Sequence, residues 1–168
     1  MRKILLLLIS LILISCSVSD DSDEFTGLNF DQNTFDRNRQ LWDVNETSNY
    51  TFSQVYSSNS IGSQPKLTSI VLNSELDSIF IQSKYENDTS IEGLTYYGTV
   101  DDVYLFIENI ANYYEEEIDS NMIGVKIDIT YDDTFHYPTE LKCNGYYSEA
   151  VLGGVSFQFI FSDFEVRQ

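Results

Sequence analysis

The sequence has little of what enzymes most often use for chemistry. It contains one histidine and two cysteines among its 168 residues. No HExxH zinc motif, DxDxDG calcium loop or GxSxG nucleophile elbow is present. We therefore expect a protein that is not an enzyme and that needs no cofactor.

The sequence also lacks a hydrophobic run long enough for a transmembrane helix. Its longest apolar run, Ile4–Ile14, is interrupted only by Ser10 and follows Arg2 and Lys3. A run of this length is too short to span about 30 Å of hydrocarbon, which needs about 20 residues. A basic start, a short apolar run and a small residue before a cleavage site are typical of a secretion signal. We predict a signal peptide over residues 1–15.

The end of this signal carries a more specific pattern. Leu13-Ile14-Ser15-Cys16 resembles the lipobox of bacterial lipoproteins, whose cysteine receives a diacylglyceryl group and becomes the new N-terminus. The resemblance implies lipidation at Cys16, attachment to a membrane through that lipid and a location in the cell envelope. An aspartate directly after the lipidated cysteine resembles an inner-membrane retention signal, and this chain has Ser17 there instead. If the cell has an outer membrane, Ser17 therefore favours that membrane. An uncleaved anchor and an ordinary secretory signal are the alternatives.

Basic residues are scarce. Cleavage before Cys16 would remove Arg2 and Lys3 and leave seven of the nine basic residues against 27 acidic ones, a formal charge of −20. Such a surface repels phosphates, so nucleic acid is excluded as a partner. Lipidation of Cys16 would leave Cys143 as the one free thiol, so we expect no disulfide within the chain.

The composition divides the mature chain into two parts. Residues 16–26 are small, polar and acidic and are predicted to form a flexible tether. Residues 27–168 are predicted to form a single α+β domain, which at about 150 residues can bury close to 70% of its unfolded surface.

Two helices are predicted. The first covers residues 34–44, with Asn33 or Thr34 as N-cap and with Phe35, Leu41 and Trp42 facing the core. The second covers residues 100–117, where Thr99 and Asp102 can form a capping box. Its apolar stripe consists of Val103, Phe106, Ile107, Ile110, Ala111, Tyr114 and Ile118.

The remaining segments alternate between apolar and polar residues and predict strands. The predicted strands are 50–56, 66–73, 76–84, 124–131, 138–143 and 155–164, with turns at 73–75, 132–137 and Asn144-Gly145. The order is α-βββ-α-βββ. Such an order is commonly solved as one antiparallel sheet, here of about six strands, with two helices packed on one face.

Several separated segments resemble one family. They are Arg39–Trp42, Asn49–Phe52, Thr99–Ile107, Ile129–Asp132, Tyr137–Thr139 and Phe161–Phe164. In order and spacing they look like the small bacterial lipoproteins of the domain-of-unknown-function family 6174. The resemblance implies an extracytoplasmic lipoprotein domain and no known activity. Many relatives carry a Cys-x-Cys pair after the first strand, whereas Val55–Asn59 has none.

One turn holds the only histidine together with two carboxylates. Asp132, Asp133 and His136 could ligate a divalent metal, or His136 could act as a general base oriented by Asp132. The preferred interpretation is structural: the aspartates cap turn amides, and Pro138 sets the φ of the returning strand.

Paired tyrosines suggest a binding surface. The pairs are Tyr96-Tyr97, Tyr113-Tyr114 and Tyr146-Tyr147. At most one ring of each pair can face the core from a strand, so we regard Tyr97, Tyr113 and Tyr147 as candidate binding residues. Packing at the edge of a small core is the alternative.

These patterns together favour a lipid-anchored cell-envelope protein with a non-catalytic binding domain. We expect a protein or glycan partner, bound by exposed tyrosines or by an open sheet edge. The alternative is a metal-dependent or hydrolytic envelope enzyme that uses the turn with Asp132, Asp133 and His136. A surface protein without a defined ligand is the third possibility.

Overall fold

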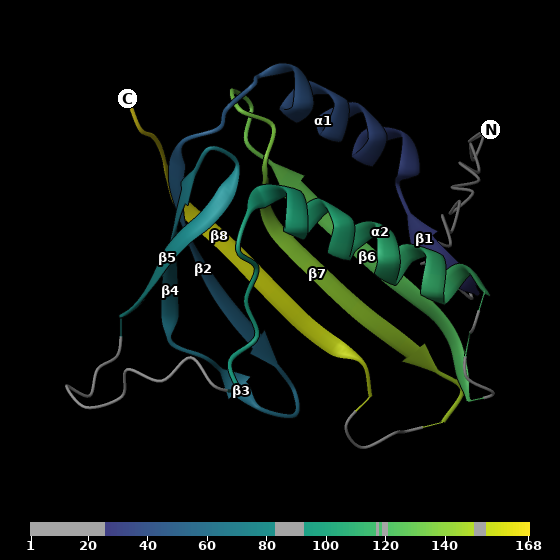
Figure 1. Cartoon of the computed structure of the whole chain (residues 1–168). Coiled ribbons are helices and arrows are strands. Elements are labelled where there is room, and N and C mark those ends of the chain that lie inside the picture. The colour runs from purple at the N-terminus through teal and green to yellow at the C-terminus, as the bar shows by residue number, and fades with distance from the viewer. Residues whose placement is uncertain (1–25, 83–92, 117, 119–120, 150–153) are drawn as a thin grey trace, which may run out of the picture.

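The computed structural model describes residues 26–82, 93–116, 118, 121–149 and 154–168. The predicted signal peptide, Cys16 and nearly all of the predicted tether lie outside these residues. Figure 1 shows two helices in front of a twisted sheet. None of the helices in the described ranges has the length and hydropathy needed to cross a membrane.

The elements follow one another in the order β-α-ββββ-α-βββ. They are β1 Gly27–Phe30, α1 Gln32–Val44, β2 Tyr50–Ser58, β3 Gly62–Ser63, β4 Lys66–Leu72, β5 Glu75–Gln82, α2 Val100–Glu116, β6 Met122–Tyr131, β7 Pro138–Tyr147 and β8 Ser156–Val166. Every predicted helix and strand overlaps one of these elements. The α+β class with two helices is therefore confirmed.

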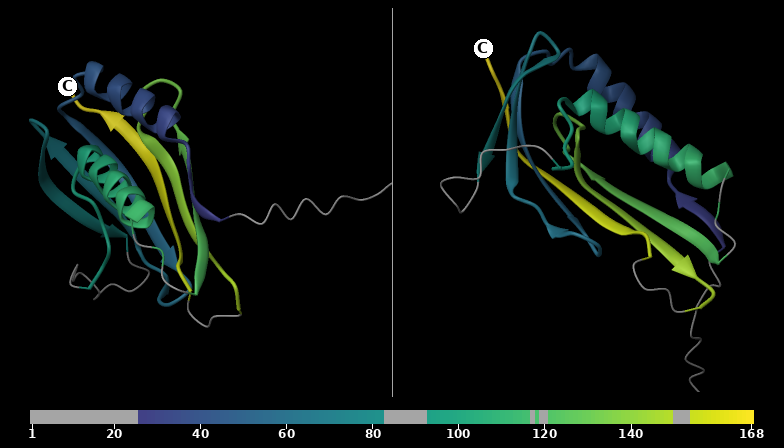
Figure 2. Two further views of the ribbon diagram at one scale, coloured as in Figure 1. Left: turned by 90° about the vertical axis from the view of Figure 1, so that its right-hand side faces the viewer. Right: turned by 60° about the horizontal axis from the view of Figure 1, so that its bottom comes forward.

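The strands form one sheet in the order β1-β6-β7-β8-β2-β4-β5, with β3 paired to β2 outside this path. Each helix is followed by an antiparallel meander: β2, β4 and β5 after α1, and β6, β7 and β8 after α2. The two meanders join where β2 pairs with β8. Both views in Figure 2 place α1 and α2 on the same side of the sheet.

The prediction of six antiparallel strands is incomplete, because β1 pairs with β6 in the parallel direction and β3 adds a short pairing. Gly27 and Asn29 disfavour a strand on local preference, and the segment has only four residues. It is extended because Leu28 and Phe30 pack against the core. Tertiary packing outweighs local propensity here.

The first helix begins earlier than predicted. Asp31, not Asn33 or Thr34, is the N-cap, and its carboxylate accepts a hydrogen bond from the Thr34 amide at 3.0 Å. The predicted core residues Phe35 and Trp42 are buried, whereas Leu41 is 38% exposed. The buried face instead continues through Asn38, which lies three and four residues from Phe35 and Trp42.

The second helix begins at the predicted capping box. The Thr99 amide donates to the Asp102 carboxylate at 2.9 Å, and the Asp102 amide donates to the Thr99 hydroxyl at 3.1 Å. Val103, Ile107 and Ala111 of the predicted stripe are buried. The two helices are linked by the Arg39–Glu108 ion pair at 2.6 Å.

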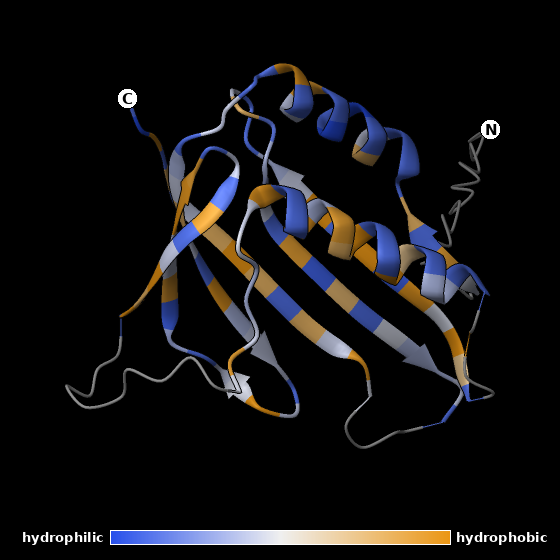
Figure 3. Cartoon of the chain, in the orientation of Figure 1, coloured by the Kyte–Doolittle hydropathy of each residue, from blue (hydrophilic) through white to orange (hydrophobic). Residues whose placement is uncertain are grey.

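The core lies between the helices and the sheet. Along the strands the residues alternate between apolar and polar (Figure 3), so one face is apolar and the other is mostly polar. On β8, Phe159 and Phe161 are buried and stack with ring centroids 5.6 Å apart. Phe106 of α2 reaches Phe159 at 6.1 Å, which identifies this side as the helix side.

The two predicted tight turns have different outcomes. Asn73 and Ser74 have positive φ and Leu72 pairs with Glu75, so a two-residue hairpin joins β4 and β5 as predicted. The predicted turn at Asn144-Gly145 is wrong, since both residues belong to β7 and Gly145 pairs with Val125.

Candidate functional site

The turn between β6 and β7 is organised by Asp132. One oxygen of its carboxylate accepts the amides of Thr134 at 2.9 Å and Phe135 at 2.7 Å. The Asp132 carbonyl accepts the amide of His136 at 3.0 Å. The predicted capping role of Asp132 is therefore confirmed, and this carboxylate serves the turn.

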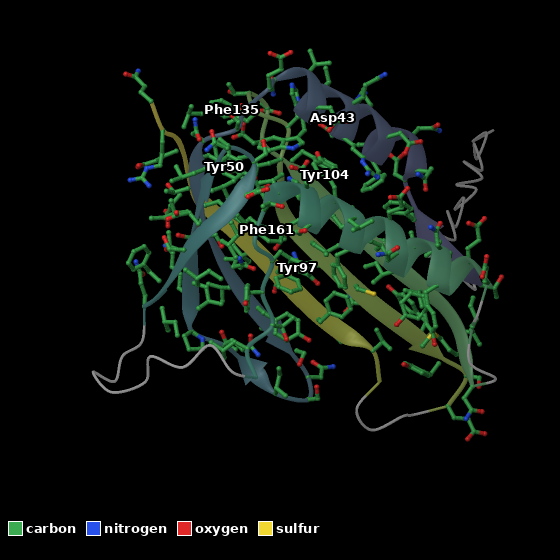
Figure 4. The ribbon with its side chains drawn as sticks, in the orientation of Figure 1. Asp43, Tyr50, Tyr97, Tyr104, Phe135 and Phe161 are labelled. Atoms are coloured by element: carbon green, nitrogen blue, oxygen red, sulfur yellow. The ribbon has the colours of Figure 1, made fainter. Side chains whose placement is uncertain are left out.

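The rest of the molecule holds this turn from two sides. The Asn45 side chain donates to the Phe135 carbonyl at 3.0 Å, and the Tyr104 hydroxyl donates to the His136 carbonyl. The Phe135 ring packs on Phe164 at 5.0 Å. Phe135 and Tyr50 lie at the same end of the molecule in Figure 4.

The candidate metal residues are not gathered into a site. In the ranges that the structure describes, no three His, Cys, Asp or Glu side chains are grouped so as to hold a metal ion. The side chains of Asp132, Asp133 and His136 therefore do not converge on one point where a metal ion could bind. The thiol of Cys143 is buried, and burial raises its pKa to about 12. Such a thiol stays protonated and unreactive near neutral pH.

The three candidate tyrosines lie in different environments. The Tyr97 ring is half-buried against Phe106 at 4.8 Å and Phe159 at 5.2 Å, and this burial raises the pKa of its phenol. Tyr147 is half-buried too. Tyr113 is 56% exposed. Their surroundings leave Tyr113 as the most accessible of the three.

The backbone of Tyr97 is held by a buried glutamine. The Gln54 side chain accepts the Tyr97 amide at 2.8 Å and donates to the Tyr97 carbonyl at 2.7 Å. Gln54 is 1% exposed. Its amide thus pairs with the connecting segment before α2 much as a neighbouring strand would.

The sheet face away from the helices is open and nearly charge-balanced. Lys66, Lys126 and Lys142 lie on or beside this face, because their neighbours along the strands are buried on the helix side. Each lysine pairs with one carboxylate: Lys66 with Asp163, Lys126 with Asp128 at 3.0 Å, and Lys142 with Glu140 at 2.9 Å. A hollow of about 410 Å³ lies on this face near the β2–β3 hairpin.

The second accessible feature is the edge formed by β5. This strand ends the sheet order and pairs with β4. Leu76 is 39% exposed and Phe80 is 56% exposed. Because Ile70 pairs with Ser78 and Val71 with Leu76, Asp77 forms a bulge, and the following segment Ser78–Gln82 contains no charged residue.

Sequence reasoning predicted the alternating faces of the strands but missed the open-face hollow and the Gln54 contact. Both depend on which strands are neighbours, and periodicity within one strand contains no such signal. Comparison of the chain with protein-family models, curated proteins and solved structures found no match. The resemblance to family 6174 stays a prediction.

Proposed function

We propose that the protein is a lipid-anchored, extracytoplasmic binding module, and that the free edge of β5 holds an extended segment of a partner protein. One observation carries the proposal: Ser78–Gln82 is uncharged and lies on a strand that ends the sheet. A sheet edge presents unpaired backbone N–H and C=O groups. A partner segment can pair with these groups as an added strand.

The position of β5 suits a protein attached at its N-terminus. β1 and β5 form opposite edges of the sheet (Figure 1). A lipid on Cys16 precedes β1 in the chain, so the domain would be attached through the β1 edge. The β5 edge is then the one farther from the attachment point.

The chemistry of the edge favours a positively charged partner with apolar side chains. Phe80 and Leu76 offer exposed apolar side chains that a partner can contact, while Glu75 and Asp77 add negative charge next to them. The whole chain has a formal charge of −18. Charge of one sign attracts partners of the other and accelerates their association.

Site-specific photocrosslinking in intact cells tests this proposal. A photoreactive residue at position 80 is compared with one at position 113, because Phe80 and Tyr113 are both 56% exposed but lie on β5 and α2. We expect position 80 to crosslink to an extended basic segment that mass spectrometry identifies. Crosslinks from position 113 and none from position 80 would contradict binding at the β5 edge and would favour binding at the surface around Tyr113.

A binding measurement with the identified segment completes the test. As a synthetic peptide, the segment should bind the wild-type protein and the Tyr113→Lys variant equally. It should lose its affinity for the Phe80→Lys variant, which removes the apolar contact and adds a charge at the edge. Equal binding by both variants would refute the role of β5.

The lipid anchor has its own test. Cells supplied with labelled palmitate should incorporate the label into the wild-type chain and into Cys143→Ala, but not into Cys16→Ala. The two variants each remove one of the two cysteines of the chain. Label in the Cys16→Ala variant, or none in the wild type, would contradict the anchor.

The alternative, a metal-dependent or hydrolytic enzyme, gains no support from the described residues. The Asp132 carboxylate is bonded to the Thr134 and Phe135 amides of its own turn. We therefore propose no second function.

A further inference from the structure

The open face of the sheet carries aligned polar side chains at one end. Ser63 pairs with Ser57, Ser57 with Gln158, and Gln158 with Lys142. Directly paired residues point to the same face, on strands about 4.8 Å apart. These four side chains therefore form one row across β3, β2, β8 and β7.

A second row lies beside the first. Asn144 pairs with Ser156, and the Ser156 hydroxyl donates to the Asn144 side-chain oxygen at 2.9 Å. Two adjacent rows of hydroxyl and amide groups on one face form a patterned polar surface. Each group in it can both donate and accept hydrogen bonds, apart from the Lys142 ammonium, which only donates.

The 410 Å³ hollow lies over these two rows. Its lining includes Ser57, Ser63, Gln158, Lys142, Asn144 and Ser156. Among the residues that the structure describes, no carboxylate lines the hollow, although the chain has 27 acidic residues against nine basic ones. The hollow thus offers neutral hydrogen-bonding groups and one positive charge within a strongly acidic molecule.

We propose that this hollow binds an acidic saccharide, with sugar hydroxyls on the serine, asparagine and glutamine side chains and one carboxylate on the Lys142 ammonium. Sugar hydroxyls both donate and accept, as the lining groups do. When a ligand carboxylate replaces Glu140 at Lys142, one ammonium still faces one carboxylate, whereas a doubly charged phosphate would add excess negative charge to a chain of formal charge −18. The site is separate from the β5 edge and does not depend on the function proposed for that edge.

Glu140 competes with such a ligand. It lies outside the lining, yet it pairs with Lys142 at 2.9 Å and accepts a hydrogen bond from the Gln158 side chain at 2.5 Å. These contacts hold the pKa of the Glu140 carboxyl below its usual value. An incoming carboxylate must displace it from Lys142, so removal of the Glu140 charge should tighten binding.

Calorimetry on the full-length lipoprotein in detergent tests the proposal. The probes are a disaccharide of glucuronic acid and xylose, which carries one carboxylate, and its neutral methyl ester. The variants are Lys142→Met and the control Lys126→Met. The two lysines share the open face, pair with one carboxylate each and have side chains 44% and 40% exposed.

We expect the wild type to bind the acid about tenfold more tightly than the ester, since a charge-assisted hydrogen bond is lost in the ester. Lys142→Met should remove this preference, Lys126→Met should keep it, and Glu140→Gln should tighten binding of the acid. Absence of saturable binding of both probes at millimolar concentration would overturn the proposal, and so would equal losses in the two lysine variants. The Phe80→Lys variant should bind the acid as the wild type does, which separates this site from the β5 edge.

Discussion

Tyr147 determines which residues can surround it. A Cβ at Gly145 would lie 3.0 Å from the Tyr147 hydroxyl oxygen, and one at Gly154 would lie 2.5 Å from its ring. The same hydroxyl accepts the Val155 amide at 2.7 Å. Gly145 therefore makes room for a ring inside a strand, although the dipeptide Asn144-Gly145 has the local pattern of a turn.

We predict that Gly154→Ala lowers the free energy of unfolding by about 1–3 kcal/mol, because the new methyl group would overlap the Tyr147 ring. Urea denaturation measures the change. In a Tyr147→Ala background the same substitution should cost much less, since its partner in the overlap is gone. An equal cost in both backgrounds would show that the ring is not the cause.

The contact between Gln54 and Tyr97 leads to a second prediction. Gln54→Leu should lower the free energy of unfolding by about 1–3 kcal/mol, because the Tyr97 amide would lose its acceptor and the Tyr97 carbonyl would keep only the Ser69 hydroxyl as donor, at 3.3 Å. Urea denaturation gives the size of the loss, and faster hydrogen exchange at the Tyr97 amide locates it. Unchanged exchange at Tyr97 would contradict this assignment of Gln54.

At the scale of elements, the start of α2 depends on its capping box. We predict that Thr99→Ala lowers the free energy of unfolding by about 0.5–2 kcal/mol, because the Asp102 amide loses its acceptor. Thr99→Ser keeps the hydroxyl and should lose much less. Thermal unfolding of the two variants checks the difference, and equal losses would assign the effect to the missing methyl group instead.

The strands at the two edges show how tertiary contacts modify local preference. β1 has only four residues and little strand propensity, but its parallel pairing with β6 and the packing of Leu28 and Phe30 hold it extended. β5 has strong strand propensity and leaves Phe80 exposed. The strand propensity of a segment therefore does not predict which edge strand packs its large apolar side chains against the core.

At the scale of the whole molecule, the core contains many tyrosine rings. Burial raises the pKa of Tyr50, Tyr97 and Tyr104, and it raises that of Tyr114 to about 12. In the unfolded chain these phenols lose their protons near a pH of about 10. The folded state therefore binds more protons above that pH, so the stability that these groups contribute is present at lower pH and falls as pH rises.

We predict that the urea midpoint decreases slightly from about pH 8.5, where the Cys143 thiol begins to ionise in the unfolded chain only, and decreases more steeply above about pH 10, where the tyrosines add to the effect. Tyr104→Phe removes one of the linked groups and should make the decrease less steep. It also removes the hydrogen bond to the His136 carbonyl, so its midpoint at pH 8 serves as the reference for its own curve. A constant midpoint up to about pH 11 would contradict the linkage.

Much of the fold could be predicted from local patterns. The capping box at Thr99 and Asp102 and the hairpin turn at Asn73 and Ser74 depend on contacts within a few residues, so the sequence shows them directly. The role of Asp132 in its turn was predictable for the same reason. The parallel β1 and the strand conformation of Asn144-Gly145 were not, because both depend on pairing with β6, which the local sequence does not show.

By itself, the sequence determined the positions of the helices and most strands, and it determined the acidic character of the chain. Caps, turns and alternation act over a few residues, and charge is a property of composition. Only the tertiary structure decided that Ser57, Gln158 and Lys142 form one row and that β5 ends the sheet. Strand order and register are set by the packing of the whole core, which brings together residues far apart in the chain.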